Sequence, residues 1–308
     1  MVMKQKSSEI PTLSHYETAV AGDVKLRGQE RISPGCPLVH FAHGNGFCAM
    51  TYWPYLRRLP ADFGLCLHDA AGHGDSDPGK DFAGWNATAE RLAQLVRQRR
   101  SSWGASMVIG MGHSFGAVIT LLAAARHPGL FDRLLLLDPV PFFLDYGWLK
   151  SSRRASSMLL PLNPMARQAR DRTPSWTDRE NAWNYLYQRG IFRNWSDEAL
   201  AAYIDYALRH VPDGSVHLKC PPWMEAAIFS TAPSQLWSSV SALNLPTDIL
   251  FGRSSFPFLE RQMRHCTRVN AHIKVHSMEG GHCFMQEYPV SSADKASQLL
   301  STANWLPT

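Results

Sequence analysis

The 308-residue sequence predicts an α/β fold in which a mainly parallel, doubly wound sheet carries an inserted helical cap. Short apolar runs that break into glycine-rich turns alternate with helical patterns in the first half of the chain, and the same alternation returns near its end. Between these two parts the pattern changes to helical segments with many aromatic residues and no clear buried strand. A chain of this length can build one large core that carries such an insertion.

A β-hairpin and two buried strands are expected first. Apolar and polar residues alternate from Tyr16 to Arg27 about Gly22-Asp23, two turn residues that tolerate positive φ. Apolar runs follow at residues 37–42 and 63–68, and each ends in a glycine-rich turn, which is typical of buried parallel strands.

Helices and strands then alternate. Apolar residues recur at helical spacing over residues 86–100, which predicts an amphipathic crossover helix. A strand is expected at 107–111 and another at 134–137. Between them, residues 117–126 are nearly all apolar and stop at His127-Pro128-Gly129, which is how a helix buried against a sheet ends.

The alternation of strands and helices resumes with strands expected at 247–251 and 273–277. We therefore assign residues 1–141 and 244–308 to the core, and residues 142–243 to a helical cap above the carboxyl edge of the sheet.

Charge, cysteines and hydropathy exclude several classes of function. The formal net charge is +5, but the basic residues are scattered along the chain, so we expect no nucleic-acid partner. No apolar run approaches the roughly 18 residues that a membrane span needs. The six cysteines stand singly and no secretory leader precedes them, which predicts reduced thiols and a cytoplasmic location.

The strongest local signal for chemistry is Gly112-His113-Ser114-Phe115-Gly116, which lies directly after an apolar strand and directly before an apolar helix. A serine at such a turn is forced into a strained backbone conformation, and the residues two before and two after it must be very small. The turn lifts the hydroxyl clear of the sheet and points the first N–H groups of the helix toward a developing anion. We expect Ser114 to be a nucleophile.

A serine hydroxyl is a poor nucleophile at neutral pH, so a histidine must take its proton. Chain order places that histidine near the end of the chain, and Gly280-Gly281-His282 follows the last predicted strand. The glycines would let a loop carry the imidazole over the sheet edge. His282 is therefore the expected general base.

A third glycine-rich segment, His43-Gly44-Asn45-Gly46-Phe47, ends the predicted strand at 37–42. Acyl transfer needs two N–H donors for the oxyanion, and one of them should come from the loop after this strand. We assign this role to the backbone N–H groups of Asn45 and Phe115.

Together these segments resemble the α/β-hydrolase superfamily, and specifically its capped members related to epoxide hydrolases, haloalkane dehalogenases and esterases. The resemblance rests on His43-Gly44, on the stretch from Asp69 to Ser76, on the elbow at Ser114 and on Gly281-His282. In the resembling dehalogenases and epoxide hydrolases the elbow carries an aspartate, whereas this chain has a serine. The resemblance thus implies hydrolysis of an ester, thioester, lactone or amide, or the rarer C–C bond hydrolysis or perhydrolysis.

The acid of the triad departs from the common pattern of these relatives. Most of them place an aspartate a few residues past the strand that corresponds to 247–251, but the loop at residues 252–256 reads GRSSF and has no carboxylate. Asp248 lies at the beginning of that strand, which is the wrong edge of a parallel sheet.

Asp138 ends the preceding strand at the correct edge, and some family members resembling haloalkane dehalogenases draw their acid from that position. An aspartate before Pro139 also commonly just turns the chain. We choose Asp138 as the acid and keep Glu260 as the reserve.

The expected mechanism is acyl transfer: Asp138 holds the tautomer of His282, His282 deprotonates Ser114, and water hydrolyses the acyl-enzyme. A cap over a catalytic serine generally lines a mainly apolar pocket, so small to medium hydrophobic substrates are expected, with no metal and no organic cofactor. Most of the cap's aromatic residues and one of its methionines should pack its own core: Trp148, Met158, Trp176, Trp183, Tyr185, Tyr187, Trp195, Tyr203, Tyr206 and Trp223, with Phe142 and Phe143 at its entrance.

Alternatives stay open on sequence alone. A receptor could use this fold to trap a ligand without turnover, and the missing carboxylate after Phe251 favours that alternative. Among enzymes, the sequence does not separate an esterase from a lactonase, a C–C hydrolase or a perhydrolase, and it leaves the oligomeric state open.

Overall fold

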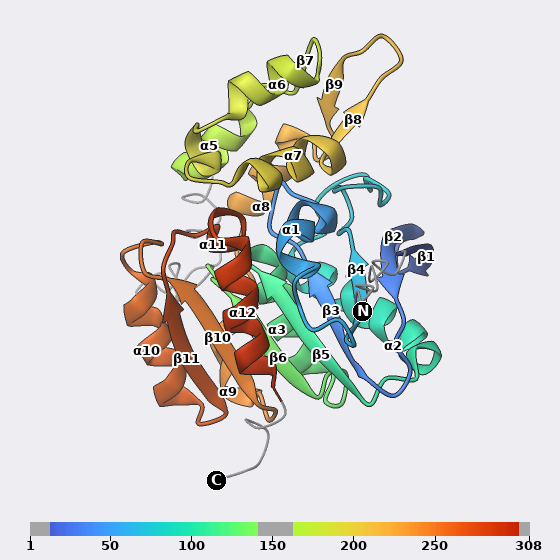
Figure 1. Cartoon of the computed structure of the whole chain (residues 1–308). Helices are drawn as coiled ribbons and strands as arrows, with labels where there is room; N and C mark the ends of the chain where they lie inside the picture. Colours follow the sequence, from blue (N-terminus) through green and yellow to red (C-terminus); the bar gives the residue numbers. More distant parts are fainter. Residues whose placement is uncertain (1–12, 141–162, 302–308) are drawn as a thin grey trace, which may run out of the picture.

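The computed structural model describes residues 13–140 and 163–301, which form a large sheet covered by helices on both faces and a smaller layer above it (Figure 1). The strand order is β1-β2-β4-β3-β5-β6-β10-β11. β2 pairs antiparallel with β1 and β4, and the other strand pairs are parallel. The strands are β1 (Ser14–Val20), β2 (Val24–Arg31), β3 (Pro37–Ala42), β4 (Gly64–His68), β5 (Met107–His113), β6 (Arg133–Leu137), β10 (Thr247–Gly252) and β11 (Ile273–Met278).

Both faces of the sheet are buried, and alternate residues of each central strand point to opposite faces. On β3, Leu38 belongs to one buried cluster and Val39 to the other. The first cluster includes residues of α2, α3, α9 and α10, and the second includes residues of α1, α11 and α12. These helices are α1 (Trp53–Leu56), α2 (Trp85–Trp103), α3 (Phe115–Arg126), α9 (Leu236–Ala242), α10 (Leu259–Val269), α11 (Phe284–Glu287) and α12 (Pro289–Leu300), and the 3-10 helix η1 (Ala49–Tyr52) precedes α1.

The predicted fold class is confirmed, and the predicted core strands lie close to the observed ones. The hairpin also turns where it was expected, because Gly22 and Asp23 both adopt positive φ between β1 and β2. The helix predicted at 86–100 extends to Trp103 and ends at Gly104, whose left-handed conformation is a common way to stop a helix.

The smaller layer lies above the carboxyl edge of the large sheet in Figure 1. Side-chain caps fix the start of three of its helices, because Asn163, Asp178 and Ser196 each accept a hydrogen bond from a backbone N–H of the first turn. Its elements are α5 (Pro164–Arg170), β7 (Ser175–Trp176), α6 (Arg179–Leu186), the 3-10 helix η5 (Gly190–Phe192), α7 (Asp197–Tyr206), β8 (Leu208–His210), β9 (Val216–Leu218) and α8 (Pro222–Phe229).

Two features of this layer differ from the purely helical cap expected for residues 142–243. It contains a three-stranded antiparallel sheet, β7-β9-β8, whose strands are only two or three residues long. Strands this short leave almost no periodic signal in a sequence. At the other end of the range, α9 packs directly against α3, so we assign α9 to the core. The start of the predicted range, residue 142, lies outside the described residues.

Candidate active site

Ser114 lies in the turn that joins β5 to α3, and its backbone has a φ of 52°. The two flanking glycines permit this turn because strand and helix approach each other closely. A Cβ atom at Gly112 would lie 2.6 Å from the carbonyl group of Gly116, and one at Gly116 would lie 2.1 Å from the carbonyl oxygen of Ala42. The backbone N–H of Ser114 donates to the carbonyl of Leu137 on the neighbouring strand, at 3.0 Å. The close packing at the two glycines and the hydrogen bond to Leu137 thus hold Ser114 in its strained conformation.

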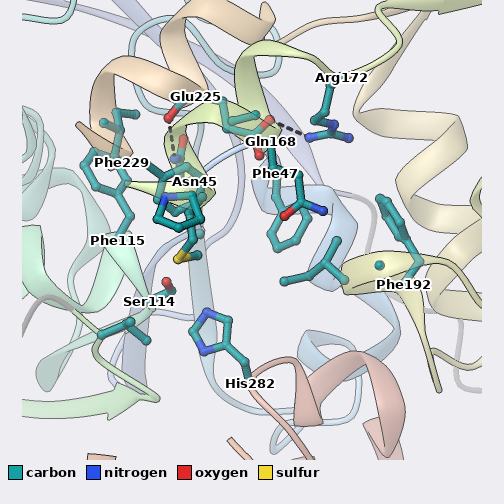
Figure 2. A pocket seen from close by; sticks show the side chains of 18 of the residues that line it. Asn45, Phe47, Ser114, Phe115, Gln168, Arg172, Phe192, Glu225, Phe229 and His282 are labelled. Atoms are coloured by element: carbon teal, nitrogen blue, oxygen red, sulfur yellow. Dashed lines mark hydrogen bonds and ion pairs between the residues drawn. The ribbon is translucent and has the colours of Figure 1, made fainter. Parts of the chain in front are cut away.

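A cavity of about 760 Å³ opens above this turn, and Ser114 and His282 both line it (Figure 2). Figure 2 shows the hydroxyl of Ser114 and the imidazole of His282 together on one side of the cavity. Much of the remaining wall is apolar, with side chains from the core and from the layer above it: Phe47, Trp85, Phe115, Val140, Met165, Leu186, Phe192, Ile228 and Phe229.

His282 lies in the loop after β11, and Asp138 follows the end of β6. The Nδ1 atom of His282 lies 2.9 Å from Oδ1 of the fully buried Asp138. Because an ionised carboxylate only accepts, this contact places the proton on Nδ1 and leaves Nε2 as the basic nitrogen. Glu287 of α11 holds the same loop by accepting a hydrogen bond from the N–H of Gly281 at 2.9 Å.

The loop after β10 holds the carboxylate of Asp138. The hydroxyl of Ser255 donates to Oδ1 at 2.7 Å, and the N–H of Gly252 donates to Oδ2 at 2.9 Å. Asp138 itself has a φ of 43°, so its backbone is strained like that of Ser114. This loop is the segment in which the resembling relatives carry their acid; here it contributes hydrogen-bond donors to an acid from the neighbouring strand.

The two other carboxylates considered on sequence lie elsewhere. Glu260 is exposed on α10 and pairs with Arg264 at 2.9 Å. Asp248 lies near the start of β10, where it contacts Arg133 and His276. The structure therefore brings Asp138 to His282, whereas Asp248 and Glu260 pair with other residues.

Asn45 and Phe115, the residues assigned to the oxyanion site, both line the cavity next to Ser114. Among the described residues, neither backbone N–H has a hydrogen-bond acceptor. The loop that carries Asn45 is held from two directions: its side-chain amide donates to the carbonyl of Glu225 at 3.0 Å, and the N–H of Gly46 donates to Nε2 of His73 at 3.2 Å. Burial, with the nearby His43, lowers the pKa of His73 to about 3, so its ring is neutral and can accept this bond.

A buried chain of hydrogen bonds connects the three glycine-rich segments of the site. Nε2 of His113 lies 2.9 Å from the backbone carbonyl of His282, so this nitrogen must donate. Burial and the neighbouring His282 lower the pKa of His113 well below its usual range, and its neutral Nδ1 therefore accepts from the hydroxyl of Tyr52 at 2.6 Å. The Tyr52 oxygen accepts in turn from the N–H of Gly44 at 3.1 Å.

Sequence reasoning missed the residues that hold the site together: Tyr52, His113, Arg172, Glu225, Ser255 and Glu287. Except for Glu287, which contacts Gly281 six residues before it, their contacts join segments that are distant along the chain, and no spacing rule connects them. His113 was the one with a usable signal, because it lies inside the elbow motif and a histidine there has a polar ring to satisfy.

The described aromatic residues expected in the cap form a buried and an exposed group, and Trp183 is partly buried between these extremes. Trp176, Trp195 and Tyr203 are buried, whereas Tyr185, Tyr187, Tyr206 and Trp223 are exposed to at least about a third. Of these seven only Tyr185 lines the cavity. Phe192 and Phe229, two further aromatic residues of the cavity wall, were not singled out on sequence. Phe142, Phe143, Trp148 and Met158 lie outside the described residues.

Within residues 13–140 and 163–301, no helix is both long and apolar enough to cross a membrane. In the same residues, no group of three or more His, Cys, Asp or Glu side chains is arranged to hold a metal ion. All six cysteines are free thiols.

Comparison with known proteins gives one family match that spans most of the chain. The model described as "Alpha/beta hydrolase family" matches residues 41–294. Among curated relatives, a 2-(acetamidomethylene)succinate hydrolase of Mesorhizobium japonicum is 31% identical over 39% of this chain and 41% of its own length. Human monoglyceride lipase is 29% identical over 33% of this chain and 35% of its own length. The matched segments thus span less than half of these relatives.

Solved structures match over nearly the full chain. An E-2-(acetamidomethylene)succinate hydrolase superposes with a TM-score of 0.75 at 21% identity, covering 93% of this chain and 98% of that one. A peroxisomal α/β-hydrolase of Saccharomyces cerevisiae superposes with a TM-score of 0.73 at 18% identity, covering 96% and 90%. At such identities the likeness concerns the fold.

Proposed function

The chain belongs to the α/β-hydrolase family, and we propose that within it the chain is a serine hydrolase that cleaves carboxylic ester bonds, or thioester or lactone bonds, of small to medium hydrophobic substrates through an acyl-enzyme. Ser114 is the nucleophile, His282 the general base and Asp138 the acid that fixes the tautomer of His282. The backbone N–H groups of Asn45 and Phe115 form the oxyanion hole. The enzyme needs neither a metal nor an organic cofactor for these steps.

The observation that carries the proposal is the contact between Asp138 and His282 beside a serine held in a strained turn. With its Nδ1 proton directed at Asp138, 2.9 Å away, His282 presents Nε2 as the base. In the first step Nε2 takes the proton of Ser114 while the hydroxyl oxygen attacks the ester carbonyl. The oxyanion that forms accepts from Asn45 and Phe115, and the protonated imidazole gives its proton to the leaving alcohol. Water repeats the sequence on the acyl-enzyme.

Free donors at the elbow support this route. Ser114 precedes α3, whose first N–H groups carry partial positive charge, and the N–H of Phe115 is the first of them. The loop that bears Asn45 is fixed by Glu225 and His73, so its donor needs little reorganisation when charge develops.

The wall of the cavity supports hydrophobic substrates. Its volume of about 760 Å³ lies within the range of small-molecule sites, and aromatic and aliphatic side chains surround Ser114. Relatives named as an esterase and as monoglyceride lipases are consistent with an ester as substrate. The relative named for 2-(acetamidomethylene)succinate favours instead a small polar substrate with an amide.

We further propose that the layer between β6 and α9 is the cap of this active site. Met165, Leu186 and Phe192 of this layer line the cavity above Ser114, which would exclude water during catalysis. Because α9 packs against α3, whereas α8 packs against α5, we place the end of the cap before Leu236 and not at residue 243. A cytoplasmic location remains part of the proposal, and it rests on the six free thiols.

A receptor without turnover is the competing function. The feature that favoured it was the missing carboxylate after Phe251, but Asp138 meets His282 from the neighbouring strand, so the histidine does not lack an acid. No contact of the site favours C–C hydrolysis or perhydrolysis over ester hydrolysis.

A panel of p-nitrophenyl esters from acetate to laurate tests the proposal. The wild type should hydrolyse the short and medium esters fastest, and Ser114→Ala should lose turnover of all of them. Ser238→Ala, which changes an exposed serine on α9, is the matched control and should behave as the wild type. Full activity in Ser114→Ala, or no ester cleaved by the wild type, would contradict the proposed function.

A further inference from the structure

The wall of the cavity opposite Ser114 contains a buried ion pair, which an apolar pocket does not need. Glu225 of α8 is 8% exposed, and its Oε2 lies 2.5 Å from Nη1 of Arg172, in the loop after α5. The other terminal nitrogen of Arg172 donates to the hydroxyl of Tyr203 at 2.7 Å. Figure 2 shows this pair on the far side of the cavity from Ser114 and His282, with Phe47 between.

Within residues 13–140 and 163–301, one oxygen of this carboxylate has no hydrogen-bond donor. Among the described residues, Arg172 is the hydrogen-bond partner of the Glu225 side chain, and it contacts Oε2. Burial raises the pKa of Glu225, and the charge and hydrogen bond of Arg172 counteract this rise. This oxygen keeps some accessible surface, and Glu225 lines the cavity, so a ligand there can supply the donor.

The loop beside Ser114 is shaped to admit this carboxylate. Gly46 has a φ of 77°, and a Cβ atom at this position would lie 2.8 Å from the carboxyl carbon of Glu225. Any larger residue at Gly46 would displace the carboxylate from the cavity wall. The carboxylate of Glu225 therefore packs against the same loop that carries Asn45.

The charges around the cavity decide which donor fits. Arg167, Asp171 and Arg189 also line it, but all three are exposed, so water and salt screen them. Of the described charged residues that line the cavity, only Arg172 and Glu225 are largely withdrawn from water, and their opposite charges cancel. A substrate carboxylate would meet Glu225 as a like charge, and an ammonium group would meet Arg172 in the same way.

We propose that Glu225 and Arg172 form a polar subsite that binds an uncharged hydrogen-bond donor, a hydroxyl or amide N–H, at the end of the substrate remote from the bond attacked by Ser114. This inference rests on the proposed function, since it assigns the substrate class of the same cavity. The substrate is then an ester with an apolar middle and a neutral polar end.

Two series of matched esters test the subsite. The first consists of pentyl acetate, the monoacetate of 1,4-butanediol and 4-acetoxybutanoate, which end in methyl, hydroxyl and carboxylate at similar length. The second places the same ends on the acyl side, as ethyl heptanoate, ethyl 6-hydroxyhexanoate and monoethyl adipate. Acid release in a pH-stat gives kcat/KM for each ester.

In at least one series the hydroxyl ester should exceed the methyl ester about tenfold, because a hydrogen bond to an ionised acceptor outweighs the apolar wall, and the carboxylate ester should be the slowest. Preference for the carboxylate ester would show that Arg172 dominates and would overturn the subsite. Equal rates for the methyl and hydroxyl esters in both series would also overturn it, because the ion pair would then only support the cap.

The variant Glu225→Gln tests whether Glu225 binds the substrate or only supports the cap. In Glu225→Gln the amide oxygen can stay on Arg172, and the amide N–H groups then face the cavity as donors. In the wild type the hydroxyl ester should react faster than its methyl ether, whose oxygen can only accept a hydrogen bond. In Glu225→Gln this difference should disappear. Glu180→Gln, an exposed glutamate in the first turn of α6, is the matched control and should keep the wild-type ratio. An unchanged ratio in Glu225→Gln would contradict the subsite.

The two proposals fail separately. If the proposed function is wrong, no ester in either series will be hydrolysed in a Ser114-dependent way. If only the subsite is wrong, hydrolysis will depend on Ser114 but show no preference for the hydroxyl end. The wild-type series decides the subsite even if Glu225→Gln does not fold.

Discussion

Two pairs of neighbouring histidines, buried except for the partly exposed His282, differ in what satisfies their ring nitrogens. His113 and His282 lie with ring centroids 4.6 Å apart, and His40 and His68 stack at 4.9 Å. In the first pair, Asp138, Tyr52 and a backbone carbonyl engage three ring nitrogens. In the second pair, both ring nitrogens of His40 and Nδ1 of His68 have no partner among the described residues.

The difference teaches that burial alone does not mark a catalytic histidine. Three of the four rings are buried, but only the first pair has the acid and the orienting contacts that a catalytic imidazole would need. Changes to the first pair and its partners should therefore alter turnover. Changes to the second should alter only stability and its dependence on pH.

The largest expected effect comes from the nucleophile and the base. His282→Ala and Ser114→Ala should each lower kcat by about 10⁴-fold or more, because the hydroxyl and the imidazole act as one unit. For the same reason the double variant should be no slower than either single variant. Steady-state kinetics on one ester measure all three, and additive losses would mean that the two residues act independently.

The acid gives the next largest effect. Asp138→Asn can donate to His282 and so favours the wrong tautomer, which should lower kcat by about 10³- to 10⁴-fold. Asp248→Asn is a close control, because Asp248 also lies beside a histidine, His276, at 2.7 Å, but near the start of β10. It should leave kcat within a few-fold of the wild type. Comparable losses in both variants would indicate that Asp138 acts through stability.

Tyr52→Phe probes the chain of hydrogen bonds behind the first pair. It removes the donor to Nδ1 of His113 and the acceptor of the N–H of Gly44. We expect kcat to fall about tenfold with little change in KM, because the loop before Asn45 and the loop of His282 both lose support. A rise in KM with unchanged kcat would place Tyr52 in substrate binding instead.

His40→Leu tests the second pair and should leave turnover unchanged. Burial lowers the pKa of His40 to about 3 from an ordinary value of 6.5. The folded state therefore stays neutral at a pH where the unfolded chain takes up a proton, so stability is lost as the pH falls from 6.5 toward 3. One such histidine contributes up to about 1.4 kcal/mol per pH unit in this window.

His40→Leu should flatten this dependence when the free energy of unfolding by urea is measured across the window. His15→Leu, which replaces an exposed histidine on β1, is the matched control. If the slope of His40→Leu equals that of the wild type, the unpartnered ring does not limit acid stability.

The sequence predicted the core of the fold well because its signals are local. Apolar runs of strand length, the glycines of the elbow and the turn at Gly22-Asp23 each reflect a backbone requirement within a few residues. The same reasoning placed Asp138 and His282 at the carboxyl edge of the sheet, and the structure has them 2.9 Å apart.

Contacts between distant segments were beyond such reasoning. Ser255 and Asp138 are 117 residues apart, and Arg172 and Glu225 are 53 apart, so no periodicity connects either pair. The cap strands were missed because two or three residues show no alternation. Sequence alone did not separate α9 from the cap, because it does not show which helix an apolar face packs against.

Labelling with a fluorophosphonate, followed by intact-mass analysis and peptide mapping, tests the activation of Ser114 most directly. The wild type should gain one adduct per chain, located on Ser114, within minutes at neutral pH, and His282→Ala should react far more slowly. An unlabelled wild type, or equal labelling of wild type and His282→Ala, would contradict an activated serine at this site.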